Sequence, residues 1–260
     1  MPKRRALFVI GMHRSGTSAL ARVLNLQGAT LPRTLMPAQA DNPDGFWESL
    51  PVVQFNERLL QEACLTWDDP RPVNASWWAK KSENSRHVDE AKRLLRSEFS
   101  GSELFVLKDP RISRLMHVWL DACREMDIAP SVFLCLRNPL EVAASLEMRN
   151  GMDVQRAQLL WLAYVLDAEA TTRSVPRALL HFDDFLIDWR AVMPKAYDAI
   201  GLDCLTLSGD AADAVDNFLS MRKGHHRATT DQLLRNQGIS SLLKETWVAF
   251  SKVLVSHRET

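Results

Sequence analysis

A glycine-bracketed stretch near the N-terminus has the residue types of an anion-binding loop. It lies between a short apolar run and a segment of helical spacing, and it reads Gly11-Met12-His13-Arg14-Ser15-Gly16-Thr17-Ser18. Glycine lets the backbone curl so that successive N–H groups face one anion, and a helix start adds partial positive charge. The hydroxyls of Ser15, Thr17 and Ser18 can donate to phosphate oxygens, and Arg14 supplies a cation. We expect a phosphate-binding loop; the competing interpretation is a glycine-rich turn without function.

This loop lacks the lysine that nucleoside triphosphatases use. Gly11 and Gly16 have the spacing of the pattern G-x-x-x-x-G-K-[ST], but Thr17 stands at the lysine position. Such enzymes also hold magnesium through an acid at a strand end, and the sequence offers only Asp109 for that purpose. The loop therefore suits an anion better than a magnesium-bound triphosphate. His13 either contacts the bound group or orients the loop.

Two motifs together resemble the sulfotransferases that use 3′-phosphoadenosine 5′-phosphosulfate (PAPS). The run His13–Ser18 resembles the loop that binds the 5′-phosphosulfate in this family. The segment Arg137-Asn138-Pro139 resembles a second family motif, in which a strand ends in Arg-Asn/Asp-Pro and a serine follows eight residues after the arginine, here Ser145. Pro139 suits a first helical turn. The resemblance implies that Arg137 and Ser145 bracket the 3′-phosphate, with the arginine as a bidentate partner.

Two shorter segments also resemble parts of this family, and the likeness then covers roughly residues 5–225. Phe182, in His181-Phe182-Asp183-Asp184, takes the place of an aromatic residue that lies near the adenine. Arg222-Lys223-Gly224 resembles the segment that closes on the 3′-phosphate in cytosolic members; the competing interpretation is a solvated basic turn.

The chemistry expected from the resemblance needs a cation for the leaving phosphate and a base for the acceptor hydroxyl. Arg14 fits the first role, and Lys108 at the end of a predicted strand fits it too. The catalytic histidine of cytosolic members is missing from the segment Lys108-Asp109-Pro110-Arg111. Carbohydrate-modifying and bacterial members use a glutamate after the first helix, which indicates Glu48 as the base. No metal is expected to take part.

Glu48 has competing interpretations. Phe46 and Trp47 could remove water from its carboxyl group and raise its pKa toward a useful value. Alternatively, Glu48 only caps the helix expected to start near Pro51. Asp44 is the second choice of base and Asp109 the third.

Apolar runs that end at these motifs must supply the strands, and segments of helical period must supply the helices. Residues 28–50 are rich in Pro, Asn, Asp and Gly and predict an ordered loop. The expected strands are 6–10, 104–107, 131–136 and 178–182. The expected helices are 17–26, 52–65, 77–99 (with a break near Asn84), 112–126, 140–148, 153–170, 186–200, 210–220 and 240–256.

This alternation predicts a single α/β domain over residues 1–260, with a mainly parallel sheet between two layers of helices. The resemblance specifies the P-loop NTPase-like fold of sulfotransferases. Ligands bind beyond the carboxyl ends of the strands in such sheets, where all the motifs above are expected.

Bulk composition limits the classes of partner. The 260 residues contain 32 Lys+Arg and 32 Asp+Glu, so a general nucleic-acid binder is not expected. The four cysteines form no Cys-x-x-Cys pair, which is typical of a reducing cytosol. The apolar run after the N-terminal basic residues is too short for a signal peptide, and no run approaches the roughly 20 residues of a membrane span. We expect a soluble cytoplasmic protein.

The sequence thus predicts a sulfotransferase that uses PAPS, releases 3′-phosphoadenosine 5′-phosphate (PAP) and needs no metal. Its expected acceptor is a hydroxyl on a carbohydrate, a glycolipid precursor or a small metabolite, with cell-surface polysaccharide synthesis as one context. A P-loop kinase or NTPase and a non-catalytic PAP-binding protein of the same fold are the alternatives.

Overall fold

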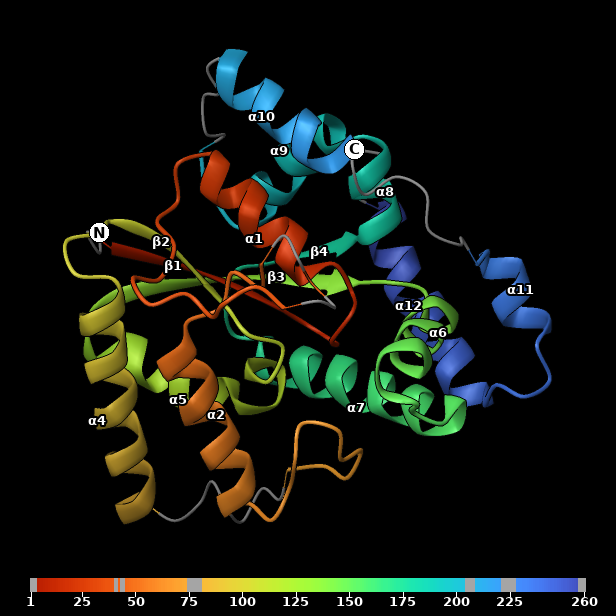
Figure 1. The fold of residues 1–260 in the computed structure, drawn as a ribbon, viewed down its shortest axis with the longest axis horizontal. Coiled ribbons are helices and arrows are strands. Elements are labelled where there is room, and N and C mark those ends of the chain that lie inside the picture. Colours follow the sequence, from red (N-terminus) through yellow and green to blue (C-terminus); the bar gives the residue numbers. More distant parts are fainter. Residues whose placement is uncertain are drawn as a thin grey trace.

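The structure is a computed structural model that describes residues 4–39, 42, 45–73, 81–203, 209–220 and 228–256, with the side chains of 81–84 and 253–256 excepted. It has an α/β architecture in which helices cover both faces of one sheet, as the sequence predicts (Figure 1). Within those ranges, no helix is long and apolar enough to cross a membrane.

Four parallel strands form the sheet, in the order β2-β1-β3-β4. The strands are β1 (Arg4–Gly11), β2 (Leu104–Lys108), β3 (Ile128–Leu136) and β4 (Arg177–His181). The strands β1, β2 and β3 are apolar runs that are buried along most of their length, whereas the edge strand β4 buries only Ala178 and Leu180. All four carboxyl ends therefore point to the same edge of the sheet.

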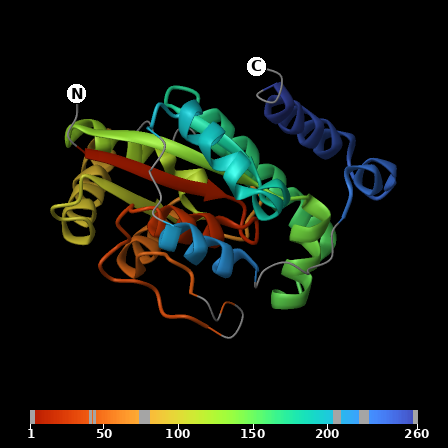
Figure 2. The same ribbon diagram turned by 90° about the horizontal axis from the view of Figure 1, so that it is seen from above.

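Alternating side chains of the strands point to opposite faces of the sheet and belong to two separate hydrophobic cores. Ala6, Phe8 and Ile10 pack toward a helical layer made of α2 (Leu50–Glu62), α4 (Lys81–Glu98), α5 (Ile112–Glu125) and α7 (Val154–Thr171). Leu7 and Val9 pack on the opposite face, toward α1 (Thr17–Leu26), α8 (Phe182–Ile187), α9 (Trp189–Ala199) and α10 (Gly209–Ser220). Figures 1 and 2 show the sheet between these two layers.

A third cluster of buried apolar side chains lies beyond the carboxyl edge of the sheet. It joins α7 to α6 (Pro139–Asn150), α11 (Thr230–Arg235) and α12 (Ser241–Ser256). Met12, which directly follows β1, and Leu136, which ends β3, belong to this cluster. It therefore supports the two strand ends that carry the predicted phosphate motifs.

Most expected elements form within a few residues of their predicted bounds, with three differences in detail. The predicted break near Asn84 is wrong, because α4 runs without interruption from Lys81 to Glu98. The predicted helix 186–200 is two helices, α8 and α9, since Asp188 leaves the helical region at φ −148° and caps α9 by accepting from the Ala191 N–H. Phe182 begins α8 and does not end β4.

The sequence analysis missed α11. Its signal is the capping box at Thr229 and Gln232, in which each side chain accepts a hydrogen bond from the backbone N–H of the other residue. The segment is only six residues long, so its apolar periodicity is too short to stand out.

The order of the strands fixes where a ligand can bind. From β1 the chain crosses to β2 on one side and then to β3 on the other. The two crossovers diverge at the carboxyl ends of β1 and β3, and this switch point is where open α/β sheets bind ligands. The loop after β1 and the Arg137 motif after β3 both start there.

Candidate functional site

The loop between β1 and α1 has an unusual backbone. Gly11 has φ +137°, and a Cβ added there would lie 2.5 Å from the Cys135 carbonyl oxygen of β3. Arg14 has φ +68° and Gly16 φ +86°, both in the left-handed region, and α1 begins directly after them at Thr17. Left-handed residues at such a turn aim successive N–H groups toward one point. The loop has the glycine-bracketed, helix-starting form that the sequence predicts.

Two buried side chains of the loop have polar atoms without a partner. Ser15 is 1% exposed and His13 9% exposed, and neither Ser15 Oγ nor His13 Nε2 has a hydrogen bond to any described residue. The His13 ring lies 4.6 Å from the Trp67 ring and 5.6 Å from the Tyr164 ring. Burial lowers the pKa of His13 well below its ordinary value, and nearby cations, Arg111 first, lower it further. The imidazole is therefore neutral at pH 7.

The loop and the Arg137 motif are in direct contact. Arg137 Nη1 donates to the carbonyl oxygen of Arg14 at 3.1 Å, and Arg14 Nε donates to Ser145 Oγ at 2.8 Å. Asn138 caps α6 through its side chain, which accepts from the Leu140 N–H, and Pro139 occupies the first turn as expected. The two strand ends thus bring together the basic groups that the sequence assigns to two phosphates.

Phe182 lies against both motifs. A Cβ added to Gly16 would lie 2.0 Å from Cδ2 of Phe182, so the ring occupies the space that only glycine leaves open. The guanidinium carbon of Arg137 lies 5.3 Å from the centre of the same ring, within the range of a cation–π contact. The aromatic residue expected near the adenine therefore lies between the loop and Arg137.

The contact between Gly16 and Phe182 leads to a stability prediction. Gly16→Ala forces a left-handed backbone on alanine and displaces the Phe182 ring, so unfolding should become about 1–3 kcal/mol easier. Gly28→Ala is the matched control, because Gly28 has φ +103° but no atom within 4 Å of an added Cβ. Thermal unfolding should show a larger loss for Gly16→Ala; equal losses would mean that the ring gives way freely.

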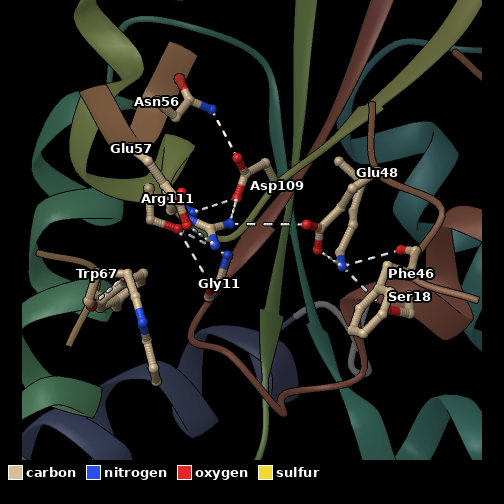
Figure 3. A network of polar contacts seen from close by, with 12 residues as sticks. Gly11, Ser18, Phe46, Glu48, Asn56, Glu57, Trp67, Asp109 and Arg111 are labelled. Atoms are coloured by element: carbon tan, nitrogen blue, oxygen red, sulfur yellow. Dashed lines mark hydrogen bonds and ion pairs between the residues drawn. The ribbon is translucent and has the colours of Figure 1, made fainter. Parts of the chain in front are cut away.

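Lys108 and Glu48 form a buried ion pair beside the loop (Figure 3). Lys108 ends β2, and its Nζ donates to Glu48 Oε1, to Ser18 Oγ at 3.1 Å and to the Phe46 carbonyl oxygen at 3.2 Å. The lysine is 2% exposed and the glutamate 5% exposed. Ser18 is the second residue of α1, so its hydrogen bond attaches the ion pair to the start of this helix. Predicted base and predicted cation therefore meet in one place.

Burial raises the pKa of Glu48, and the carboxylate of Asp109 raises it further. Lys108 and Arg111 act in the opposite direction, because a nearby cation favours the ionised carboxyl group. The alternative interpretation of Glu48 as a helix cap is wrong. Ser49 is the N-cap residue of α2, and its hydroxyl accepts from the Val52 N–H at 3.3 Å.

The two aromatic residues before Glu48 do different things. Phe46 contributes its carbonyl oxygen to Lys108. Trp47 has φ +58°, packs with the α1 cluster, and lies with its ring 4.8 Å from the Arg22 guanidinium carbon. A left-handed residue directly before the buried carboxylate is a strained conformation of a kind that gathers at functional sites.

The sequence analysis missed a polar network on the far side of Glu48. Arg111 Nη1 lies 3.8 Å from Glu48 Oε2 and donates to Asp109 Oδ1 at 2.9 Å. Asp109 Oδ2 accepts from Asn56 Nδ2 at 2.8 Å. Both oxygens of the fully buried Asp109 are therefore bonded, which makes it a poor base and a good anchor. Its place after Lys108 was visible in the sequence, but its partners were not.

Some predicted site residues lie outside the described residues: Asp44 and the run Arg222-Lys223-Gly224. The chain that follows this run is attached to the site. The Ala228 N–H donates to Glu141 Oε1 at 2.8 Å, and Asn138 Nδ2 donates to the Ala228 carbonyl oxygen at 2.9 Å. Glu141 also accepts from Arg137 Nε at 2.8 Å.

Two further findings concern binding sites. Among the described residues, no group of three or more His, Cys, Asp and Glu side chains could hold a metal ion.

A cavity of about 700 Å³ lies along β4 and is lined by residues such as Val192 of α9 and Phe250 of α12. Neither the loop residues 11–18 nor Lys108 or Arg137 line it, so it is not the space between the two phosphate motifs.

The sequence matches no family model and no curated protein. The sulfotransferase domain from the curacin biosynthetic pathway is similar in structure, with a TM-score of 0.51 and 13% identity over 95% of this chain and 98% of that one. The sulfotransferase domain of the Synechococcus PCC 7002 olefin synthase gives a TM-score of 0.48 and 19% identity over 98% and 95% of the two chains. Sulfotransferase STF1 from Mycobacterium tuberculosis H37Rv gives 0.48 and 17% over 95% and 77%.

The curacin domain aligns along almost the whole of both chains, so the likeness extends beyond the central sheet to the helices around it. At this level of identity, the likeness concerns the path of the backbone and not the chemistry of the side chains. This chain has the fold of a sulfotransferase domain.

Proposed function

We propose that this protein transfers a sulfuryl group from PAPS to an acceptor hydroxyl. The proposal rests chiefly on one observation, the contact of the two strand ends through Arg137 Nη1 and the Arg14 carbonyl oxygen at 3.1 Å. That contact supports the proposal because it joins the loop expected to bind an anion to the second basic motif, at the switch point of the sheet. A nucleotide with phosphates on both its 5′ and 3′ sides would match this pair.

The residues present fit such a donor. The Ser15 hydroxyl is buried in the loop without a protein partner, as expected for a group that donates to a ligand oxygen. The missing Cβ of Gly16 lets the Phe182 ring pack directly against the loop. On the other side, Arg137 and Ser145 would bind the 3′-phosphate, and Phe182 offers a ring face near the adenine. PAPS supplies the sulfuryl group and leaves as PAP.

The roles in the chemistry follow from charge. The acceptor oxygen bonds to sulfur while the bond from sulfur to the phosphate oxygen breaks, so negative charge develops on the phosphate. Arg14 and Lys108 would stabilise that charge. Glu48 would take the proton of the acceptor hydroxyl, and its raised pKa makes it a better base than an exposed glutamate. Water is poorly admitted, because both members of the ion pair are buried.

We propose a hydroxyl on a carbohydrate, a glycolipid precursor or a small metabolite as the acceptor. A P-loop kinase or NTPase is the second candidate, favoured by the glycine spacing of the loop and opposed by Thr17 at the lysine position. A PAP-binding protein without activity would share the donor site and fail to turn over any acceptor.

Selective stabilisation by PAP tests the donor assignment. PAP at about 100 times its Kd should stabilise the fold by about 2.7 kcal/mol and raise the Tm by about 5–10 °C. ATP with magnesium at the same concentration should give a much smaller shift, because the loop lacks the lysine for a triphosphate. A larger shift with magnesium-ATP would instead identify a kinase or NTPase.

A further inference from the structure

Arg111 lies close enough to the loop to affect His13, but its hydrogen bonds and ion pairs go to carboxylates outside the phosphate motifs. It directly precedes α5, and its guanidinium bonds to three carboxylates: Nη1 donates to Asp109 Oδ1 at 2.9 Å and lies 3.8 Å from Glu48 Oε2, while Nη2 donates to Glu57 Oε1 at 2.9 Å. Its side chain is only 10% exposed. A buried arginine among carboxylates fixes their positions as well as their charge.

The arginine itself is firmly anchored to the core. The Arg111 N–H also donates to Asp109 Oδ1, at 3.0 Å, so the same carboxylate holds both its backbone and its side chain. Asp109 is held in turn by Asn56, whose Oδ1 accepts from Trp119 Nε1 at 3.1 Å. Asn56, Asp109 and Trp119 are all completely buried. Hydrogen bonds therefore run from Trp119 of α5 through Asn56 and Asp109 to Arg111, and an ion pair at 3.8 Å completes the connection to the carboxylate of Glu48. Figure 3 shows the part from Asn56 to Glu48.

We propose that Arg111 is a positioning residue that holds the Glu48 carboxylate in place and keeps it ionised, acting through Glu48 and not on the donor. This inference rests on the proposed function only in taking Glu48 as the base. Without Arg111, Glu48 would share a buried site with the like charge of Asp109, and the carboxyl group would hold its proton to higher pH. A protonated Glu48 cannot accept the proton of an acceptor hydroxyl.

Several charged side chains of the described residues surround Glu48. Lys108 ends β2 and pairs with Oε1, Asp109 follows it, Arg111 faces Oε2, and Glu57 of α2 reaches the cluster only through Arg111. His13 adds no charge, because burial keeps its imidazole neutral. Lys108 remains in every variant below, so differences between variants report on Arg111 and Asp109.

Two variants of one cluster should move the titration of Glu48 in opposite directions. Arg111→Gln removes the cation and should raise the pKa of Glu48 by about one to three units, whereas Asp109→Asn removes the like charge and should lower it. Arg111→Lys keeps a cation and should stay near the wild type. Arg124→Gln is the matched control, because Arg124 lies near the end of α5, the helix that Arg111 precedes, and its side chain is 73% exposed.

The titration is measured by ¹³C NMR of the full chain labelled at the glutamate carboxyl carbons, with the Glu48 signal assigned from Glu48→Gln. The acid limb of kcat/KM against pH should shift in the same sense, while the Kd for PAP stays within about twofold. The NMR titration needs no enzymatic activity. If the protein fails to transfer a sulfuryl group, the proposed function is refuted, and the titration still tests whether Arg111 controls the pKa of Glu48.

Three results would overturn the inference. The first is an unchanged Glu48 titration in Arg111→Gln, and the second is a shift of the same sign in Arg111→Gln and Asp109→Asn, which structural damage would give. The third is a loss of PAP affinity of more than about tenfold in Arg111→Gln, which would place the arginine on the donor. If Arg111→Gln does not fold, Asp109→Asn and Arg111→Lys still decide: the first must lower the pKa and the second must leave it nearly unchanged.

Discussion

Glu48→Gln is expected to lower kcat by about 10²- to 10⁴-fold, the usual contribution of a general base. The amide keeps the shape of the side chain, and its oxygen can still accept from Lys108, so the fold should be retained. The amide cannot take up a proton from the acceptor hydroxyl. Steady-state kinetics at saturating PAPS, together with calorimetry of PAP binding, should show a slow enzyme with nearly unchanged donor affinity.

The control for this prediction is Glu245→Gln, because Glu245 is exposed on α12 and far along the chain from the ion pair. It should have wild-type kinetics. Loss of PAP binding in step with turnover would assign Glu48 a structural role. The pH profile of the wild type gives a further check. Because burial raises the pKa of Glu48, lowering the pH should protonate it, and kcat/KM should begin to fall at a pH above the ordinary glutamate pKa of 4.5.

Arg137→Ala is expected to weaken PAP binding by about 2–5 kcal/mol, which is at least about 30-fold in Kd. The alanine removes the guanidinium assigned to the 3′-phosphate and leaves that dianion without its main partner. Isothermal calorimetry with PAP measures the loss, and Arg173→Ala is the control because its side chain is 69% exposed. Unchanged PAP affinity would refute the assignment.

A ligand without the 3′-phosphate separates direct from indirect effects of Arg137. This side chain also donates to the Arg14 carbonyl oxygen and to Glu141, so its removal could loosen the loop. Adenosine 5′-phosphate should bind wild type and Arg137→Ala with similar, weak affinity if the arginine acts on the 3′-phosphate. An equal loss for both ligands would show that Arg137 only supports the loop.

Local patterns in the sequence were sufficient for the fold and for placing the loop after β1 beside the Arg137 motif. The apolar run before Gly11 and the helical spacing after Gly16 predicted β1, the loop and α1 in their observed order. The Arg137 motif could be placed beside that loop because parallel strands share one carboxyl edge. Such inferences need only neighbouring residues and the rules of sheet topology.

Contacts between distant segments were beyond reach. Glu48 and Lys108 were each proposed, but their ion pair joins positions 60 residues apart and depends on how the loop before α2 folds back. The role of Arg111 could not be predicted, because only packing shows that its guanidinium lies among the carboxylates of Glu48, Glu57 and Asp109. The division of α8 from α9 was missed since it depends on the conformation of a single residue, Asp188, inside a continuous apolar pattern.

The order of the strands places Lys108 on an edge strand and the two phosphate motifs on central strands. The loop and Arg137 directly follow β1 and β3, and each of these strands pairs with a neighbouring strand on both sides. Lys108 ends β2, an edge strand, and the bridge between Thr30 and Phe105 lies on its outer side. Local opening confined to β2 would therefore displace Lys108 while the loop after β1 and the Arg137 motif stay in place.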